Sequence, residues 1–84
     1  MTDLYSVRIK FTTDKKNIIY INSIMDSYEG LGIVRTIDKK EGKVVVYSTN
    51  GLYKYAMEVL DALKSEGVKI ENLTIEESES VDEW

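Results

Sequence analysis

Residues 30–48, with the sequence GLGIVRTIDKKEGKVVVYS, decide the fold, because they hold two apolar runs separated by a short polar loop. The runs are rich in Val, Ile, Thr and Tyr, and the loop 38–42 ends in a glycine suited to a positive φ, so the pattern predicts a β-hairpin. Both faces of this hairpin carry apolar side chains. One face can pack on helices of the same chain, and we expect the other to need a partner surface.

The residues before the hairpin predict a strand and then a helix. Alternating apolar positions mark the strand, and they are Tyr5, Val7, Ile9 and Phe11. Potential N-cap side chains follow at Thr12, Thr13 and Asp14. Apolar residues then recur at helical spacing, at Ile18, Ile21, Ile24, Met25 and Tyr28. Gly30 comes where a helix needs a left-handed residue to end.

A second helix and a last strand are predicted after the hairpin. The helix follows residues 49–51, and its apolar stripe is Leu52, Ala56, Val59, Leu60 and Leu63. Gly67 occupies the position of a C-terminal cap. Residues 68–75 alternate as a strand, but the alternation changes phase at Asn72, which predicts a bulge there.

The resulting order βαββαβ predicts an α+β domain of the ferredoxin-like, split βαβ type. Four antiparallel strands form the sheet in this arrangement, and both helices cover one of its faces. We expect a single domain over residues 1–75. The acidic segment 76–84, EESESVDEW, is expected to be a disordered tail.

Charge decides which way the hairpin is turned. A loop at 38–42 gives the pairs Ile37 with Lys43, Arg35 with Val45, and Ile33 with Tyr47. Burying Arg35 and Lys43 beneath the helices without an acidic partner would cost several kcal/mol. We therefore expect the opposite set to face the helices, namely Val34, Val44 and Val46. The open face then carries Ile33, Ile37, Val45 and Tyr47 beside Arg8, Lys10 and Arg35.

Composition excludes several classes of function. The 84 residues include no Cys and no His, which removes thiol chemistry, imidazole bases and the usual zinc ligands. The sequence carries no signal-peptide pattern and no apolar run long enough to span a membrane, so a cytoplasmic protein is expected. A net charge of −4 opposes a general affinity for nucleic acid. No catalytic constellation is evident, and we expect neither enzymatic activity nor a cofactor.

The segment MDSYEGLGIVRTID, residues 25–38, resembles the signature of a family of small uncharacterised bacterial domains. Its marks are an aromatic-acidic-glycine helix end and a strand that ends in Val-Arg-Thr. More distantly, the whole chain is similar to the ACT domains, ligand-sensing βαββαβ modules that dimerise. That resemblance implies an amino-acid site near the first strand-helix turn, where this chain has Asp14 but no Pro-Gly pair.

These observations predict a non-enzymatic regulatory module that senses a small anionic metabolite or an amino acid. The candidate ligand-binding residues are Arg35, Arg8, Asp14, Gly30 and Gly32. A homodimer is expected through the open sheet face, with Ile33, Val45 and Tyr47 as its interface. Two alternatives stay open: an adaptor for protein assembly, and an RNA-binding sheet that uses Arg8, Lys10, Arg35 and Tyr47.

Overall fold

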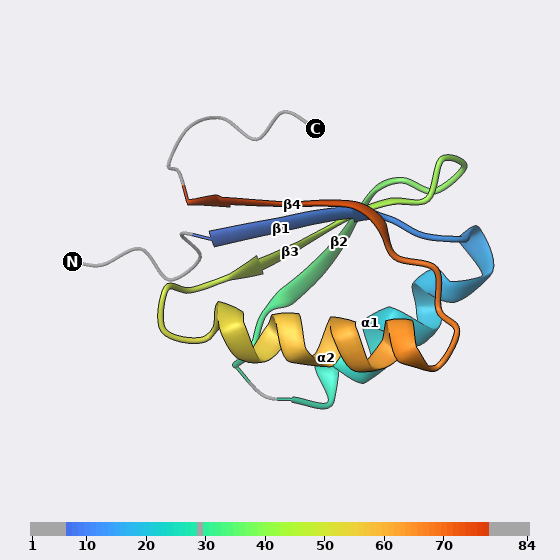
Figure 1. The fold of residues 1–84 in the computed structure, drawn as a ribbon. Coiled ribbons are helices and arrows are strands. Elements are labelled where there is room, and N and C mark those ends of the chain that lie inside the picture. Colours follow the sequence, from blue (N-terminus) through green and yellow to red (C-terminus); the bar gives the residue numbers. More distant parts are fainter. Residues whose placement is uncertain (1–6, 29, 78–84) are drawn as a thin grey trace.

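Four strands and two α-helices follow one another in the order βαββαβ in the computed structural model, which describes residues 7–28 and 30–77 (Figure 1). The strands are β1 Val7–Thr12, β2 Ile33–Asp38, β3 Lys43–Ser48 and β4 Glu71–Glu77. The helices are α1 Ile18–Asp26, which directly follows the 3-10 turn η1 Lys15–Asn17, and α2 Tyr53–Ser65. The predicted ferredoxin-like α+β fold is therefore confirmed. Tyr5, predicted in the first strand, lies outside the described residues.

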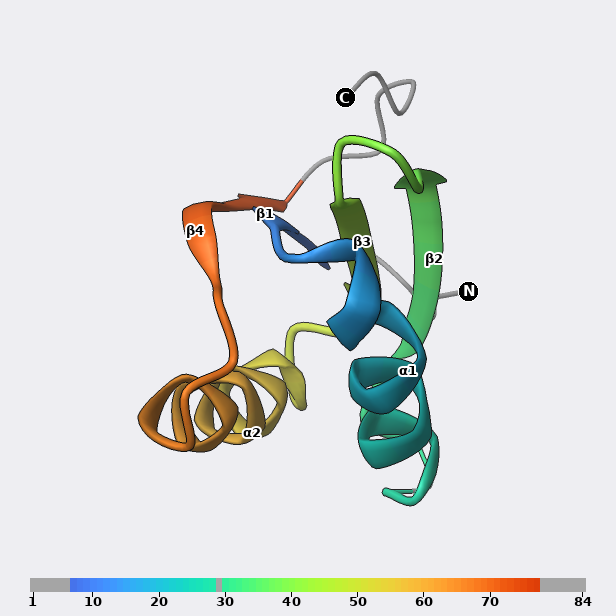
Figure 2. The same cartoon turned by 90° about the vertical axis from the view of Figure 1, so that its right-hand side faces the viewer.

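The strands form one antiparallel sheet in the order β2-β3-β1-β4, and both helices lie against the same face (Figure 2). Alternating residues of the two central strands supply the floor of the core, and the apolar stripes of the helices cover it. The largest buried apolar residues of this core are Phe11, Ile9, Ile21, Met25 and Leu60.

The hairpin is turned as its charges predict. Val44 and Val46 are fully buried in the core and Val34 packs against it, whereas Arg35 is exposed. Val45 lies between them in β3 and therefore points to the face away from the helices. The free-energy cost of burying a guanidinium group was therefore enough to predict the orientation of both strands.

The predicted hairpin register is confirmed except beside the loop. Ile33 pairs with Tyr47 and Arg35 with Val45, but Lys43 pairs with Asp38 and not with Ile37. The register shift leaves Ile37 as an extra residue in β2. Asp38 instead closes the loop, since its carboxylate accepts a hydrogen bond of 3.1 Å from the backbone N–H of Glu41.

The predicted bulge at Asn72 is confirmed. Asn72 has a φ of 55°, and the pairing of β1 with β4 gains one residue on the β4 side at this point. The strand begins at Glu71, later than predicted, although Val68 and Ile70 before it are buried. It also runs two residues beyond the predicted end, so Glu76 lies in the sheet and not in the tail. The rest of the predicted tail, 78–84, lies outside the described residues.

The starts of the helices differ from the prediction. Neither Asp14 nor Asn17 caps its helix through a side chain. The first turn closes instead through the backbone, where the N–H of Asn17 donates to the carbonyl of Asp14 at 2.9 Å. Gly30 and Gly67 have positive φ angles of 84° and 105° after the helices, as their positions predicted.

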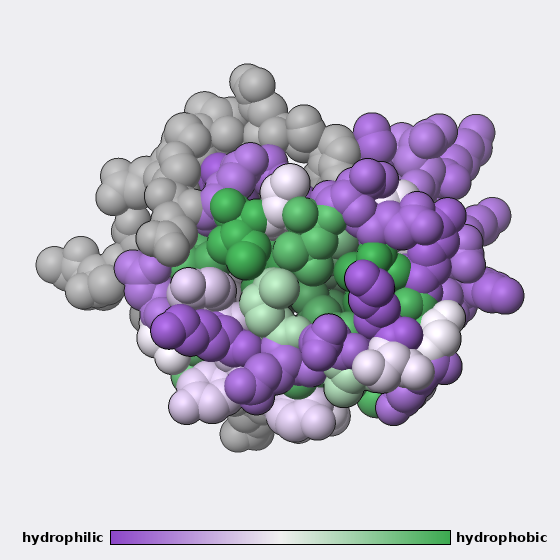
Figure 3. Space-filling view, viewed as in Figure 1, coloured by the Kyte–Doolittle hydropathy of each residue, from purple (hydrophilic) through white to green (hydrophobic). Residues whose placement is uncertain are grey.

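Apolar side chains are also visible between β4 and α2 (Figure 3). A hollow of about 230 Å³ lies there, and its apolar lining residues are Met57, Leu60, Ile70 and Leu73. Charged side chains of α2, among them Asp61 and Lys64, border it. None of the described helices is long and apolar enough to cross a membrane.

Candidate functional site

The centre of the open sheet face is a cluster of charged side chains. Arg8 and Lys10 of β1 are 6% and 5% exposed, and both approach the carboxylate of Glu76 on β4. The Glu76 Oε1 atom lies 3.4 Å from Arg8 Nη2 and 3.2 Å from Lys10 Nζ. One carboxylate therefore bridges two cations that are almost fully buried.

The bridge lowers the pKa of the Glu76 carboxyl. Hydrogen bonding from Lys10 lowers the pKa of the carboxyl below its ordinary value, and Arg8 adds to the effect. Partial burial acts in the opposite direction but does not prevail. Glu76 is thus held in the charged form that the two cations require.

Val45 lies on the open face but has no exposed surface. Its cross-strand neighbours are Lys10 and Arg35, whose long aliphatic stems can cover a small apolar side chain. Val45, one of the three residues predicted at the interface, therefore has no accessible area on this face. Tyr47 is half-buried.

The exposed apolar surface on this side of the molecule lies at β2. Ile33 is 51% exposed, and Ile37 is also exposed at the bulge. β2 is an edge strand, and no strand within the described residues pairs with its outer side. Such an edge presents unpaired backbone N–H and C=O groups to a partner strand.

The predicted ligand-binding residues do not form one site. Arg8 already binds Glu76 on the open face. β1 and β2 are both antiparallel to β3, so the start of β2 lies beside the start of β1. Gly30 and Gly32 therefore lie at the opposite end of the sheet from Asp14.

Close packing accounts for Gly32. A Cβ atom there would lie 2.8 Å from Val46 Cγ1 and 2.9 Å from the Tyr47 carbonyl oxygen, so the glycine lets the chain approach β3. Neither Gly32 nor the helix-ending Gly30 needs a ligand to explain it.

A concavity of about 610 Å³ does lie at the first strand-helix turn, where Asp14 was predicted to act. Its lining residues are Asp14, Lys15, Lys16, Ile19 and Lys39. The Asp14 carboxylate is 3.8 Å from Lys69 Nζ. The three lysines in the lining form no ion pair within residues 7–28 and 30–77. They come from two segments distant in sequence, the turn and the β2–β3 loop.

Backbone contact between these segments brings the lysines together. The N–H of Thr13 donates to the Gly42 carbonyl at 2.8 Å, and Gly42, with a φ of 73°, lies directly against the Thr13 carbonyl. Sequence reasoning singled out Arg8 and Arg35 as cations and missed Lys39. Only the positive-φ position of Gly42 in the loop signalled a close approach of the chain.

The part of the chain that the structure describes contains no group of three or more Asp and Glu side chains placed to hold a metal ion. The concavity at the turn offers ammonium groups and one carboxylate, a set that can bind an anion by charge and hydrogen bonding.

Comparison with known proteins identifies the family without assigning an activity. No curated protein and no solved structure matches the chain. A family model described as a domain of unknown function, DUF4911, matches residues 11–66. This range runs from the last two residues of β1 to the residue after α2 and includes the hairpin segment with the Val-Arg-Thr strand. The chain therefore belongs to the DUF4911 family.

Proposed function

We propose that this domain is a non-enzymatic regulatory module that pairs with a second copy of itself along strand β2. The observation that carries the proposal is the exposed apolar side chain of Ile33 on β2, an edge strand whose outer side pairs with no strand of residues 7–28 and 30–77. Addition of a strand to such an edge satisfies its backbone groups, and apolar side chains stabilise the contact. The resemblance to ACT domains, which also dimerise, supports a regulatory role.

Charge complementarity favours pairing of β2 with itself. Arg35 and Asp38 share one face of the sheet, because their partners Val45 and Lys43 are two residues apart in β3. Two copies of β2 related by a twofold axis run antiparallel. In a register that brings Arg35 of one copy within reach of Asp38 of the other, the same ion pair forms twice.

The oligomeric state tests this proposal. Light scattering at micromolar concentration should give the mass of a dimer for the parent protein. Ile33→Asp should give a folded monomer with an unchanged circular dichroism spectrum, since Ile33 lies outside the core, and its thermal midpoint should no longer depend on protein concentration. Ile19→Asp is the matched control, because Ile19 is 77% exposed on α1 and should tolerate the change without loss of the dimer. A parent protein that is monomeric throughout would contradict the proposal.

Charge reversal tests the register of the pairing. Arg35→Glu alone should weaken the dimer by placing like charges across the axis, and Arg35→Glu with Asp38→Arg should restore it. Restoration would be specific to this register. Val45→Asp is unsuitable for either experiment, because Val45 is fully buried and its replacement would test folding.

Binding of a small anion at the β1–α1 turn is a second candidate function. The concavity with three lysines that lack ion-pair partners among the described residues favours it. The resemblance to ACT domains supports the same location. Carboxylate or phosphate groups would provide the missing counter-charge.

Thermal stabilisation by citrate or pyrophosphate, compared with chloride at equal ionic strength, tests the second candidate. Lys39→Ala should reduce the stabilisation. Lys54→Ala is the control, because Lys54 is exposed on α2 and does not line the concavity. Equal responses of the two variants would show a general effect of charge and would rule out a site at the turn.

A further inference from the structure

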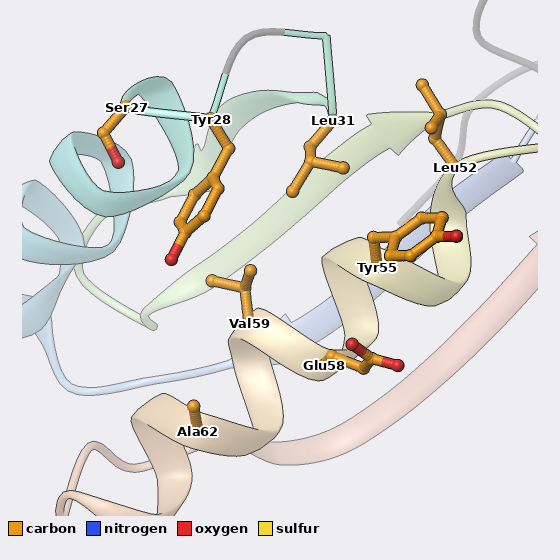
Figure 4. Close-up of a pocket in the computed structure, with 8 residues that line it drawn as sticks. All are labelled: Ser27, Tyr28, Leu31, Leu52, Tyr55, Glu58, Val59 and Ala62. Carbon is orange, nitrogen blue, oxygen red and sulfur yellow. The ribbon is translucent and has the colours of Figure 1, made fainter.

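A groove of about 920 Å³ separates α1 and α2 on the helical side of the domain. The helices are joined at one end, where the Tyr20 hydroxyl donates to Glu66 at 3.1 Å. The groove lies toward the other end and is lined by Ser27, Tyr28, Leu31, Leu52, Tyr55, Glu58, Val59 and Ala62. Tyr28 and Leu31 extend toward α2, and Val59 extends from α2 toward Tyr28 (Figure 4). Its volume is within the range of small-molecule sites.

One charged side chain and two aromatic rings distinguish this lining. Glu58 is the only charged residue among the described residues of the lining, and its carboxylate forms no hydrogen bond or ion pair with the described part of the chain. Tyr28 and Tyr55 are 49% and 55% exposed, so their rings are accessible from solvent. Aromatic faces attract cations, and a carboxylate adds a direct charge interaction.

The end of α1 adds to the negative character of the groove. Ser27 and Tyr28, which line it, directly follow the last residue of α1. The C-terminal end of a helix carries partial negative charge, which a basic residue in the last turn commonly offsets. The last turn of α1 has no basic residue and ends in Asp26. A cation bound here would supply the missing positive charge.

We propose that the groove between α1 and α2 binds a small organic cation, an ammonium group carried on an apolar body. Leu31, Leu52 and Val59 offer apolar contact for the body of the ligand. Glu58 and the two tyrosine rings select the positive charge. An anionic or neutral ligand of the same shape would lose these interactions, and an anion would also be repelled by Glu58.

Three probes of similar shape and different charge test the proposal: phenethylamine, 2-phenylethanol and benzoate. Titration into the isotopically labelled protein, followed by NMR, should shift the amide signals of the groove residues most strongly with phenethylamine. Affinity in the millimolar range is expected for so small a ligand. Equal affinity for the alcohol, or no shift of groove signals by about 10 mM of any probe, would overturn the proposal.

Two variants and a control assign the selectivity to named side chains. Glu58→Gln should weaken phenethylamine binding about three- to fivefold and leave 2-phenylethanol unchanged. Tyr55→Leu should weaken phenethylamine about two- to fivefold. Asp61→Asn removes one charge from the next turn of α2 outside the groove and should have no effect. An equal loss of phenethylamine affinity in Asp61→Asn and Glu58→Gln would show that only the net charge of the protein matters. That result would refute the site.

The groove and the proposed dimer can be tested separately. Ile33 lies on β2 and does not line the groove, so Ile33→Asp should bind phenethylamine as the parent does. Loss of binding in that variant, with its fold intact, would contradict a groove contained within one copy.

Discussion

Two groups of basic residues in this small domain have opposite surroundings. Arg8 and Lys10 are almost fully buried on the sheet, and Glu76 bridges them. The lysines at the β1–α1 turn and the β2–β3 loop are exposed and form no ion pair with the described residues. A cation in a sheet can thus be part of the architecture, whereas convergent cations without a counter-charge among the described residues are better candidates for binding a ligand.

The largest effect on stability is expected at the backbone contact that brings the exposed lysines together. Gly42→Ala places a Cβ atom against the Thr13 carbonyl at a residue with a φ of 73°. The combined clash and strain should cost about 3 kcal/mol of unfolding free energy, measured by urea denaturation. If the loop moves to relieve the clash, Lys39 should move with it and any stabilisation by citrate should decrease.

Gly67→Ala measures the cost of backbone strain in the absence of a steric clash. Gly67 has a φ of 105° after α2, and a Cβ atom there meets nothing within 4 Å. Only backbone strain remains, so the expected loss is about 1–2 kcal/mol. A loss as large as that of Gly42→Ala would argue against the role of the Thr13 contact.

The next largest effect on stability is expected for the buried cations, Arg8 and Lys10. Glu76→Gln removes the charge that faces both Arg8 and Lys10 and should lower the thermal midpoint clearly, because buried cations depend on a nearby counter-charge. Glu71→Gln is the control in the same strand. Glu71 is largely exposed and 3.8 Å from Lys69, which Asp14 also approaches, so this variant should unfold near the parent midpoint.

Acid should weaken the same bridge. The pKa of Glu76 is lowered in the folded state, chiefly by hydrogen bonding from Lys10, so its contribution is complete above the unfolded value of 4.5. This contribution is lost as the pH falls through the lower folded pKa. Thermal midpoints measured from about pH 7 to about pH 3 should therefore fall more steeply below 4.5 for the parent than for Glu76→Gln. Parallel curves would contradict the bridge.

Most of the fold could be predicted from the sequence because local patterns and charge agreed. Period-2 and helical spacing identified the elements, and the cost of burying Arg35 set the hairpin faces. The bulge at Asn72 was visible as a change of phase. The bulge at Ile37 was not visible in the sequence, because it depends on a hydrogen bond from the N–H of Glu41 to Asp38, which closes the loop.

The candidate sites were less predictable, because they depend on contacts between distant segments. Lys39 reaches the β1–α1 turn only through the approach of Gly42 to Thr13, and no local pattern encodes that contact. Glu76 follows the last predicted strand within an acidic run, so composition assigned it to the tail. Extending the strand through the Asn72 bulge would have placed Glu76 on the face of Arg8.

The smallest expected effect is an increase in stability. Lys16 lies at the start of the η1–α1 helical segment, where the partial charge is positive, and it shares the concavity with Lys15 and Lys39. Removing its charge with Lys16→Gln should stabilise the fold by about 0.3 kcal/mol at low ionic strength, and about 1 M salt should abolish the gain. Lys54→Gln is the control for the helix end alone, because Lys54 lies in the first turn of α2 but lines no concavity with other lysines, so its gain should be smaller than that of Lys16→Gln. Destabilisation by Lys16→Gln at low salt would mean that the lysines are already compensated, and the contrast with Arg8 and Lys10 would then fail.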